Sequence, residues 1–162
     1  MTLGMCALTL TNMNMMALRK ALETVEGFEG RKTIGHHGEL TKFNIPRTVW
    51  RRHTDLNPAR ADELPLYGES VAMKELIRIR TQLKEPLFDS AFWIGVYWKG
   101  GAKAIRKSKE SGAYQYGHVP NKYRKFGDAL LREYIIYAAD KRFAQRSQPR
   151  HGKNGRIVFN NG

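Results

Sequence analysis

The chain has 162 residues, with 28 lysines and arginines against 15 aspartates and glutamates, which gives a formal net charge of +13. Hydrophobic residues make up 41%, so a core is expected, and the single cysteine excludes an intramolecular disulfide framework and a zinc site of several cysteines. No segment approaches the roughly 20 apolar residues of a membrane-spanning helix. The apolar residues 3–10 lack a preceding basic residue, which is untypical of a secretory signal and predicts a cytoplasmic location.

The excess positive charge lies in the last two-fifths of the chain. Residues 1–98 carry 13 basic and 11 acidic side chains, whereas residues 99–162 carry 15 basic and 4 acidic ones, a net of +11. Such a concentrated field attracts polyanions, of which nucleic acid is the commonest. The charge distribution therefore predicts a polyanionic partner.

The N-terminal half predicts short helices separated by loops. Residues 3–10 alternate loosely and indicate an edge strand. Asn12 or Asn14 can cap a helix that runs to about Glu26 and ends at Gly27, and the glycine-rich residues 27–38 indicate a loop. The apolar face of this helix consists of Met15, Leu18, Leu22 and Val25.

Further helices are expected over residues 38–43 and 46–54, with irregular structure over residues 57–68. The clearest periodicity predicts a helix over residues 69–84, which Pro86 ends. Its apolar stripe is Ala72, Leu76, Ile79 and Leu83, and the side chains predicted to point away from the core are Lys74, Glu75 and Arg78.

Residues 91–98 are apolar on both faces and predict a buried strand, in which Gly95 indicates a bulge or a close backbone contact. After a turn at residues 99–101, which is a possible sub-boundary, a short basic helix is expected over residues 102–110.

A long helix is predicted over residues 127–146, with Phe126, Leu130, Tyr134 and Tyr137 on one face, and a last strand over residues 157–159. The predicted class is α+β: a helix-rich single domain over residues 1–146 with a small sheet, followed by a basic, mobile tail over residues 147–162.

Residues 39–53 read Glu-Leu-Thr-Lys-Phe-Asn-Ile-Pro-Arg-Thr-Val-Trp-Arg-Arg-His. This segment resembles the turn and recognition helix of helix-turn-helix DNA-binding proteins. Asn44 tolerates the left-handed conformation of a tight turn, while Ile45 and Trp50 would pack inward and Pro46 suits a first helical position. The resemblance implies major-groove and phosphate contacts, and the residues that would make them are Arg47, Thr48, Arg51 and Arg52.

Residues 99–126 interleave cations with aromatic rings, a mixture that binds single-stranded or looped nucleic acid through phosphate contacts and base stacking. The candidate contacts are Lys103, Arg106, Lys107, Lys109, Tyr114, Tyr116, Lys122, Tyr123, Arg124 and Lys125. The alternative interpretation makes the tyrosines half-buried core residues and the lysines a solvated face.

No catalytic residue, metal site or cofactor is predicted. His36 and His37 lack a convergent partner, and the carboxylates of Glu75, Glu85 and Asp89 match no motif. The sequence therefore favours a non-catalytic protein that binds duplex DNA through residues 46–52 and the basic C-terminal part. An RNA-binding or assembly protein, a metal-dependent nuclease and an inhibitor that grips an acidic protein stay open.

Overall fold

The structure is a computed structural model that describes residues 13–27, 38–83, 90–110, 112–140, 142, 150–151 and 157–158. The predicted edge strand at residues 3–10, nearly all of the predicted loop at 27–38 and most of the predicted tail lie outside the described residues. Helix dominates the described chain, and each strand is only two residues long. The helical part of the predicted class is confirmed, whereas the sheet is reduced to two small pairs.

Helix α2 (Met15–Glu26) forms where the N-terminal pattern predicts it. The side chain of Asn14 accepts a hydrogen bond of 3.1 Å from the Ala17 amide, which satisfies one of the unpaired N–H groups of the first turn. Gly27 ends the helix with a φ of 66°, a conformation that costs glycine little. Leu18 and Leu22 are fully buried, so the predicted apolar face is confirmed at its centre.

The helix expected at residues 38–43 is wrong, because these residues lead into a tight turn. Leu40 and Ile45 exchange two backbone hydrogen bonds of 2.7 and 2.8 Å, and the chain reverses between them. Thr41 and Asn44 both have positive φ, of 62° and 51°, and a helix cannot contain such residues. Helix α3 (Arg47–His53) follows directly, close to its predicted bounds.

The region predicted to be irregular instead holds a 3-10 helix, η1 (Pro58–Glu63), and the first turn of α4 (Pro65–Gln82). The predicted stripe of α4 is confirmed, since Ala72, Leu76 and Ile79 are buried. The prediction that Glu75 points away is wrong: only 5% of its side chain is exposed. Polar partners make this burial possible: Arg52 and His53 from the neighbouring helix α3, and Arg78 from α4 itself.

The strand predicted at residues 91–98 is wrong, because these residues belong to helix α5 (Ser90–Lys107). A segment in which nearly every residue is apolar shows neither the 3.6-residue period of a helix nor the two-residue period of a strand. Such a segment is compatible with a buried helix as well as with a buried strand. The helix kinks at Gly101, whose φ of 66° and ψ of −172° are not helical. Residues 102–107 continue it as the expected short basic helix.

Helix α6 (Asn121–Ala139) crosses α5 at two glycines and ends earlier than predicted. A Cβ atom on Gly95 would lie 3.0 Å from the Cα atom of Gly127, and one on Gly127 would lie 2.8 Å from the Phe92 carbonyl oxygen. The close backbone contact predicted at Gly95 is therefore confirmed, as a helix crossing. Leu130 is fully buried at this crossing.

The remaining elements are small. Strands β1 (Lys109–Glu110) and β2 (Ala113–Tyr114) form an antiparallel pair, and η2 (Tyr116–His118) leads into α6. Strand β4 (Ile157–Val158) pairs with β3 (Arg150–His151), which confirms the last strand.

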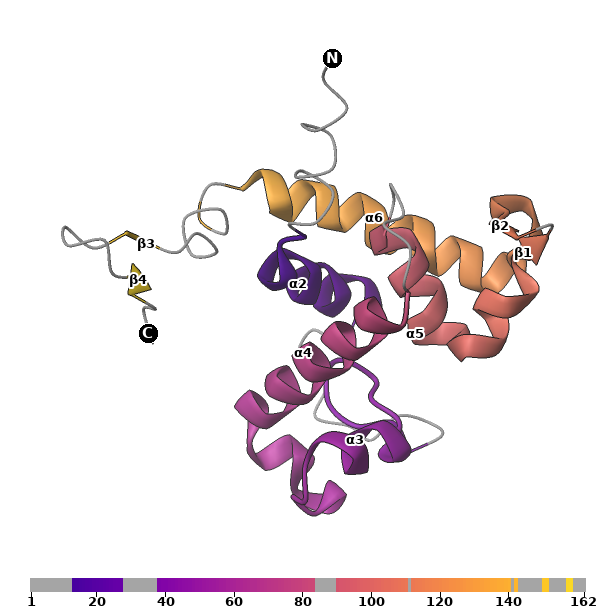
Figure 1. The fold of residues 1–162 in the computed structure, drawn as a ribbon. Helices are drawn as coiled ribbons and strands as arrows, with labels where there is room; N and C mark the ends of the chain where they lie inside the picture. The colour runs from indigo at the N-terminus through magenta and orange to yellow at the C-terminus, as the bar shows by residue number, and fades with distance from the viewer. Residues whose placement is uncertain are drawn as a thin grey trace.

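Helix α6 packs against both α2 and α5, while α4 contacts α2, α3 and α5 (Figure 1). One core cluster joins these helices, and it includes Trp50, Leu76 and Phe92. None of the helices in the described part of the chain combines the length and the apolar character needed to cross a bilayer.

Candidate functional sites

Helix α3 presents the side chains singled out by the helix-turn-helix resemblance. Ile45 and Trp50 are fully buried, and Asn44 is left-handed, as predicted. Pro46 precedes the helix as its N-cap rather than opening it. The exposed side chains of this helix are Arg47, Thr48, Arg51 and Arg52. The element directly before α3 is the tight turn, so a helical partner does not adjoin it in sequence.

The cations predicted at residues 103–125 belong to the end of α5, to β1 and to the beginning of α6. These parts of the chain lie close together at one end of the molecule (Figure 1). We call this surface the basic end. It consists of the exposed side chains of Lys103, Arg106, Lys107, Lys109, Lys122 and Lys125. Arg124 is half-buried, with its guanidinium 5.3 Å from the centre of the Tyr116 ring. An array of exposed lysines and arginines is suited to phosphate contacts.

The tyrosines of this region are already in contact with other side chains. The Tyr114 ring lies 5.1 Å from that of Trp93, and the Tyr116 ring lies 5.2 Å from that of Phe92. Tyr116 also donates a hydrogen bond of 2.7 Å to Asp128, and this bond raises the pKa of the phenol. Tyr123 is half-buried and packs on the core. The rings of Tyr114 and Tyr123 are therefore partly covered, whereas Tyr116 keeps about half of its surface exposed and can still stack on a base.

A second polar site lies where α2 ends, and its residues converge from three elements. The Glu26 side chain is 3% exposed and accepts hydrogen bonds from Asn44 Nδ2 at 2.8 Å and from Trp98 Nε1 at 3.0 Å. The Lys99 ammonium lies 2.7 Å from Glu26 Oε1. We call these four residues the carboxylate centre. Because its partners are 18, 72 and 73 residues away, only the tertiary fold assembles it.

Several features at and around the carboxylate centre are unfavourable for the stability of the helix and the turn that carry them. Glu26 is the last residue of α2, where the negative end of the helix dipole disfavours a carboxylate. Asn44 and Thr41 hold left-handed conformations, which are unfavourable for a β-branched residue such as Thr41. Gly68 accommodates this turn, since a Cβ atom there would lie 2.9 Å from Thr41 Cγ2. Backbone strain and unfavourably placed charge both gather at functional sites.

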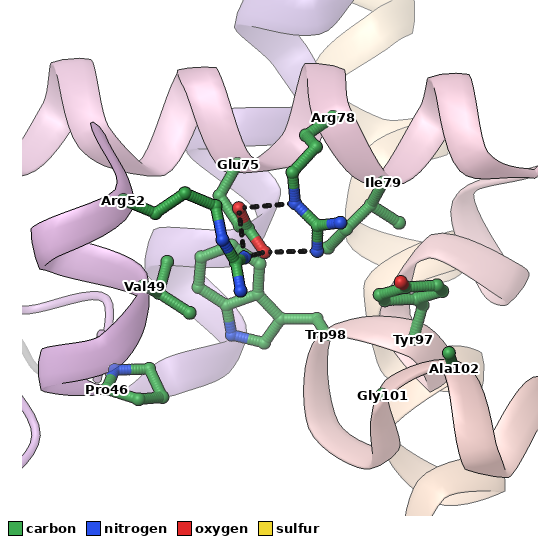
Figure 2. A pocket seen from close by; sticks show the side chains of 10 residues that line it. All are labelled: Pro46, Val49, Arg52, Glu75, Arg78, Ile79, Tyr97, Trp98, Gly101 and Ala102. Atoms are coloured by element: carbon green, nitrogen blue, oxygen red, sulfur yellow. Dashed lines mark hydrogen bonds and ion pairs between the residues drawn. The ribbon is translucent and has the colours of Figure 1, made fainter.

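A pocket of about 260 Å³ adjoins this centre between α3, α4 and α5. Trp98 belongs to both, since its ring lines the pocket and its N–H donates to Glu26. Figure 2 shows the lining side chains, which are Pro46, Val49, Arg52, Glu75, Arg78, Ile79, Tyr97, Trp98, Gly101 and Ala102. Aromatic and aliphatic walls with a few fixed polar groups are typical of small-ligand sites.

One side of the pocket is an ion cluster around Glu75. Arg52 Nη1 lies 2.9 and 3.2 Å from the two Glu75 oxygens, and Arg78 donates through Nε at 2.9 Å and Nη2 at 2.7 Å. His53 Nε2 lies 2.6 Å from Glu75 Oε2. Burial by itself would raise the pKa of Glu75, but the hydrogen bonds from Arg78 and His53 and the charges of both arginines outweigh it and lower that pKa. Arg52, which the sequence predicts as a nucleic-acid contact, therefore uses Nη1 to bind Glu75 on α4.

Of the histidines and carboxylates weighed in the sequence as metal or catalytic groups, Glu75 is the one that lies among the described residues. Among the described residues, no three His, Cys, Asp or Glu side chains come together as metal ligands. Glu75 is bound by arginines, while His36, His37, Glu85 and Asp89 lie outside the described residues.

The sequence pattern did not mark Glu26 as a candidate site residue and predicted it only as the end of a helix. The available signal was a glutamate directly before the helix-ending Gly27, at the end of α2 where its charge is unfavourable. Comparisons with protein-family models, with curated proteins and with solved structures find no match to this chain.

Proposed function

We propose that the protein is a hydrolase in which Glu26 acts as the general acid and base, and that its substrate is a glycan. The observation that carries the proposal is the burial of Glu26 beside the Trp98 indole, which also lines an aromatic-walled pocket. Lysozyme protonates a leaving oxygen with a glutamic acid packed against a tryptophan. Glu26 shares the tryptophan contact, while its other partners are the polar groups of Asn44 and Lys99.

The contacts of Glu26 favour a glycosidic bond over an ester or amide. In the described structure its hydrogen-bond and ion-pair partners are an amide, an indole and an ammonium group. Nucleophilic acyl transfer would instead need a hydroxyl or thiol next to a base. A glycosidic bond can be cleaved with a single protein carboxyl when the substrate or water supplies the nucleophile.

The reaction needs only Glu26 and water. Protonated Glu26 gives its proton to the glycosidic oxygen as the bond from that oxygen to the anomeric carbon breaks. Water adds to the anomeric carbon, and the proton that it loses returns to the carboxylate. Lys99 would leave Glu26 when the substrate oxygen arrives, and catalytic contacts often tighten only in the bound complex.

Two observations favour a glycan as the substrate. Tyr97 and Trp98 offer flat apolar surfaces of the kind on which the C–H faces of sugars pack, and Arg52 and Arg78 offer donors for polar substituents. The net charge of +13 would bring the protein to an anionic polymer.

The test is release of reducing ends from a panel of neutral, amino-sugar and acidic polysaccharides. The wild-type protein should cleave at least one of them, and Glu26→Gln should slow that cleavage by about 10²- to 10⁴-fold, the usual contribution of a general acid. Glu23→Gln is the matched control, because Glu23 lies one turn earlier on α2 and pairs with Lys20 and Lys42. Cleavage of none of the polysaccharides, or equal rates for wild type and Glu26→Gln, would refute the proposal.

A second candidate function is non-catalytic binding of nucleic acid in the cytoplasm, with duplex DNA favoured over RNA. The observation behind it is the basic end, whose tyrosine rings are engaged while its cations are exposed. Arg47, Thr48 and Arg51 on α3 would add base and phosphate contacts, as the helix-turn-helix resemblance implies.

Competition among duplex DNA, single strands and structured RNA at two salt concentrations tests this second candidate. Duplex DNA should compete best. The plot of log binding constant against log salt concentration has a negative slope, and its magnitude should decrease by about 0.9 for each phosphate contact removed, for example by Lys103→Ala. Arg132→Ala, an exposed cation further along α6, is the control. Binding that does not weaken between about 50 and 200 mM salt would exclude this function.

A further inference from the structure

We propose that the pocket between α3, α4 and α5 is an oxyanion subsite that takes a sugar unit carrying a carboxylate. This inference rests on the proposed glycan-cleaving function and names the chemistry of its substrate. It is carried by the ion cluster of Figure 2, which places two guanidinium groups at the pocket with one carboxylate between them.

The cluster has an excess of positive charge and unused donors. Arg52 and Arg78 share the single negative charge of Glu75, so the three side chains together carry a net charge of +1. Arg52 uses only Nη1 for Glu75, and Arg78 uses Nε and Nη2 for Glu75 and makes a further hydrogen bond to the Tyr97 side chain. Each guanidinium has five N–H donors, so both keep donors for a ligand. The Glu75 side chain is 5% exposed, whereas those of Arg52 and Arg78 are 44% and 29% exposed.

The two arginines are also held in place before any ligand arrives. Arg78 lies over the Tyr97 ring, with 5.5 Å between its guanidinium carbon and the ring centre, and is fixed by two hydrogen bonds to Glu75. Arg52 is anchored to the same carboxylate from the opposite helix. Ordered guanidinium groups bind planar oxyanions with little loss of side-chain entropy.

The rest of the pocket suits a small ring with one charged substituent. Pro46, Val49 and Ala102 supply apolar walls, and Trp98 supplies an aromatic one (Figure 2). A net charge of +1 matches the single charge of a carboxylate better than the charge of about −1.5 to −2 on a phosphate monoester. Because Trp98 also donates to Glu26, a unit in this pocket would lie next to the proposed catalytic group.

Calorimetric titration with glucuronate, glucose and inorganic phosphate tests the subsite on the full chain. Glucuronate should bind at least about tenfold more tightly than glucose, which is the effect of one charge-assisted hydrogen bond. Arg52→Gln should weaken glucuronate binding by about the same factor, and Arg52→Lys should restore it only in part because the planar fork is lost. Arg51→Gln is the control, since Arg51 is an exposed neighbour on α3 that does not line the pocket.

Equal binding of glucuronate and glucose, tighter binding of phosphate than of glucuronate, or equal losses in Arg51→Gln and Arg52→Gln would each overturn the subsite. Thermal melting of each variant shows whether a loss reflects unfolding, and the wild-type comparison of the three ligands does not depend on any variant.

Glu26→Gln separates this inference from the proposed function. It should bind glucuronate as the wild type does, even though it cannot cleave. Glucuronate binding without any glycan cleavage would support the subsite and refute the hydrolase, whereas cleavage confined to neutral polysaccharides would support the hydrolase and refute the subsite.

Discussion

The two halves of α5 serve two regions that differ in how their charges are arranged. Before the kink at Gly101, Trp98 and Lys99 contact Glu26 in the carboxylate centre. After it, Lys103 and Lys107 point into solvent at the basic end. In the first region a buried carboxylate is paired with Lys99 and held by groups from several elements, whereas the second region consists of exposed cations. The difference teaches that a fixed, converging set of groups suits recognition of one defined group, as proposed for Glu26, whereas exposed cations suit long-range attraction of a polyanion, as proposed for the basic end.

The largest effect on stability should come from the buried carboxylate of the pocket. Glu75→Ala leaves the guanidiniums of Arg52 and Arg78 facing each other without their counter-ion, and should lower the free energy of unfolding by about 3 kcal/mol. Urea denaturation measures this difference. Glu63→Ala, which breaks an exposed pair with Arg60, should change stability by less than about 1 kcal/mol. Equal effects would contradict the distinction between the two kinds of charge.

The next effect concerns the helix crossing that supports α5. Gly127→Ala places a methyl group within 2.7 to 2.9 Å of Phe92, including its backbone oxygen, so the two helices must move apart. A loss of about 1–3 kcal/mol is expected from overpacking of this kind. Gly117→Ala, near the basic end, meets no atom within 4 Å and should be nearly neutral in the same denaturation experiment.

Acid should weaken the pocket more than the basic end. The pKa of Glu75 is lower in the folded protein than its ordinary value near 4.5, so the stability that its ionised form contributes is complete above pH 4.5. That contribution is lost as the pH falls through the lower, folded pKa. Melting temperatures measured from pH 7 to pH 3 should therefore fall more steeply for wild type than for Glu75→Gln. Parallel curves would show that Glu75 does not contribute to acid sensitivity.

The smallest effect on stability is expected at the basic end. Replacing Lys103, Arg106 and Lys107 together by alanine removes exposed charges and should change the free energy of unfolding by less than about 1 kcal/mol, while it weakens binding to any polyanion. Thermal melting and a heparin-column elution profile measure the two quantities. A large loss of stability would mean that these side chains pack rather than bind.

Local sequence patterns predicted the features that depend only on residues close in sequence, which are helix caps, helix ends and buried helix faces. The cap at Asn14, the stop at Gly27 and the stripe of Leu76 and Ile79 follow from helix periodicity and from the chemistry of helix ends, and all are present. The pattern failed at residues 91–98, since an apolar residue at every position gives no period from which helix and strand could be told apart. The prediction that Glu75 is exposed also failed, because the burial of its charge depends on the Arg52 guanidinium, which comes from another helix.

The candidate sites likewise combine features that the sequence predicts with contacts that only the tertiary fold creates. The sequence by itself determined that the chain is strongly basic, that its charge lies mainly after residue 99, and that Ile45 and Trp50 pack inward while Arg47 and Arg51 do not. Only the tertiary structure decided that Glu26 meets Trp98 and Lys99, since these residues are more than 70 positions apart. Hydrophobic periodicity predicts which side chains become buried. It does not predict which buried polar groups come into contact with each other. That pairing is fixed by the way the helices cross.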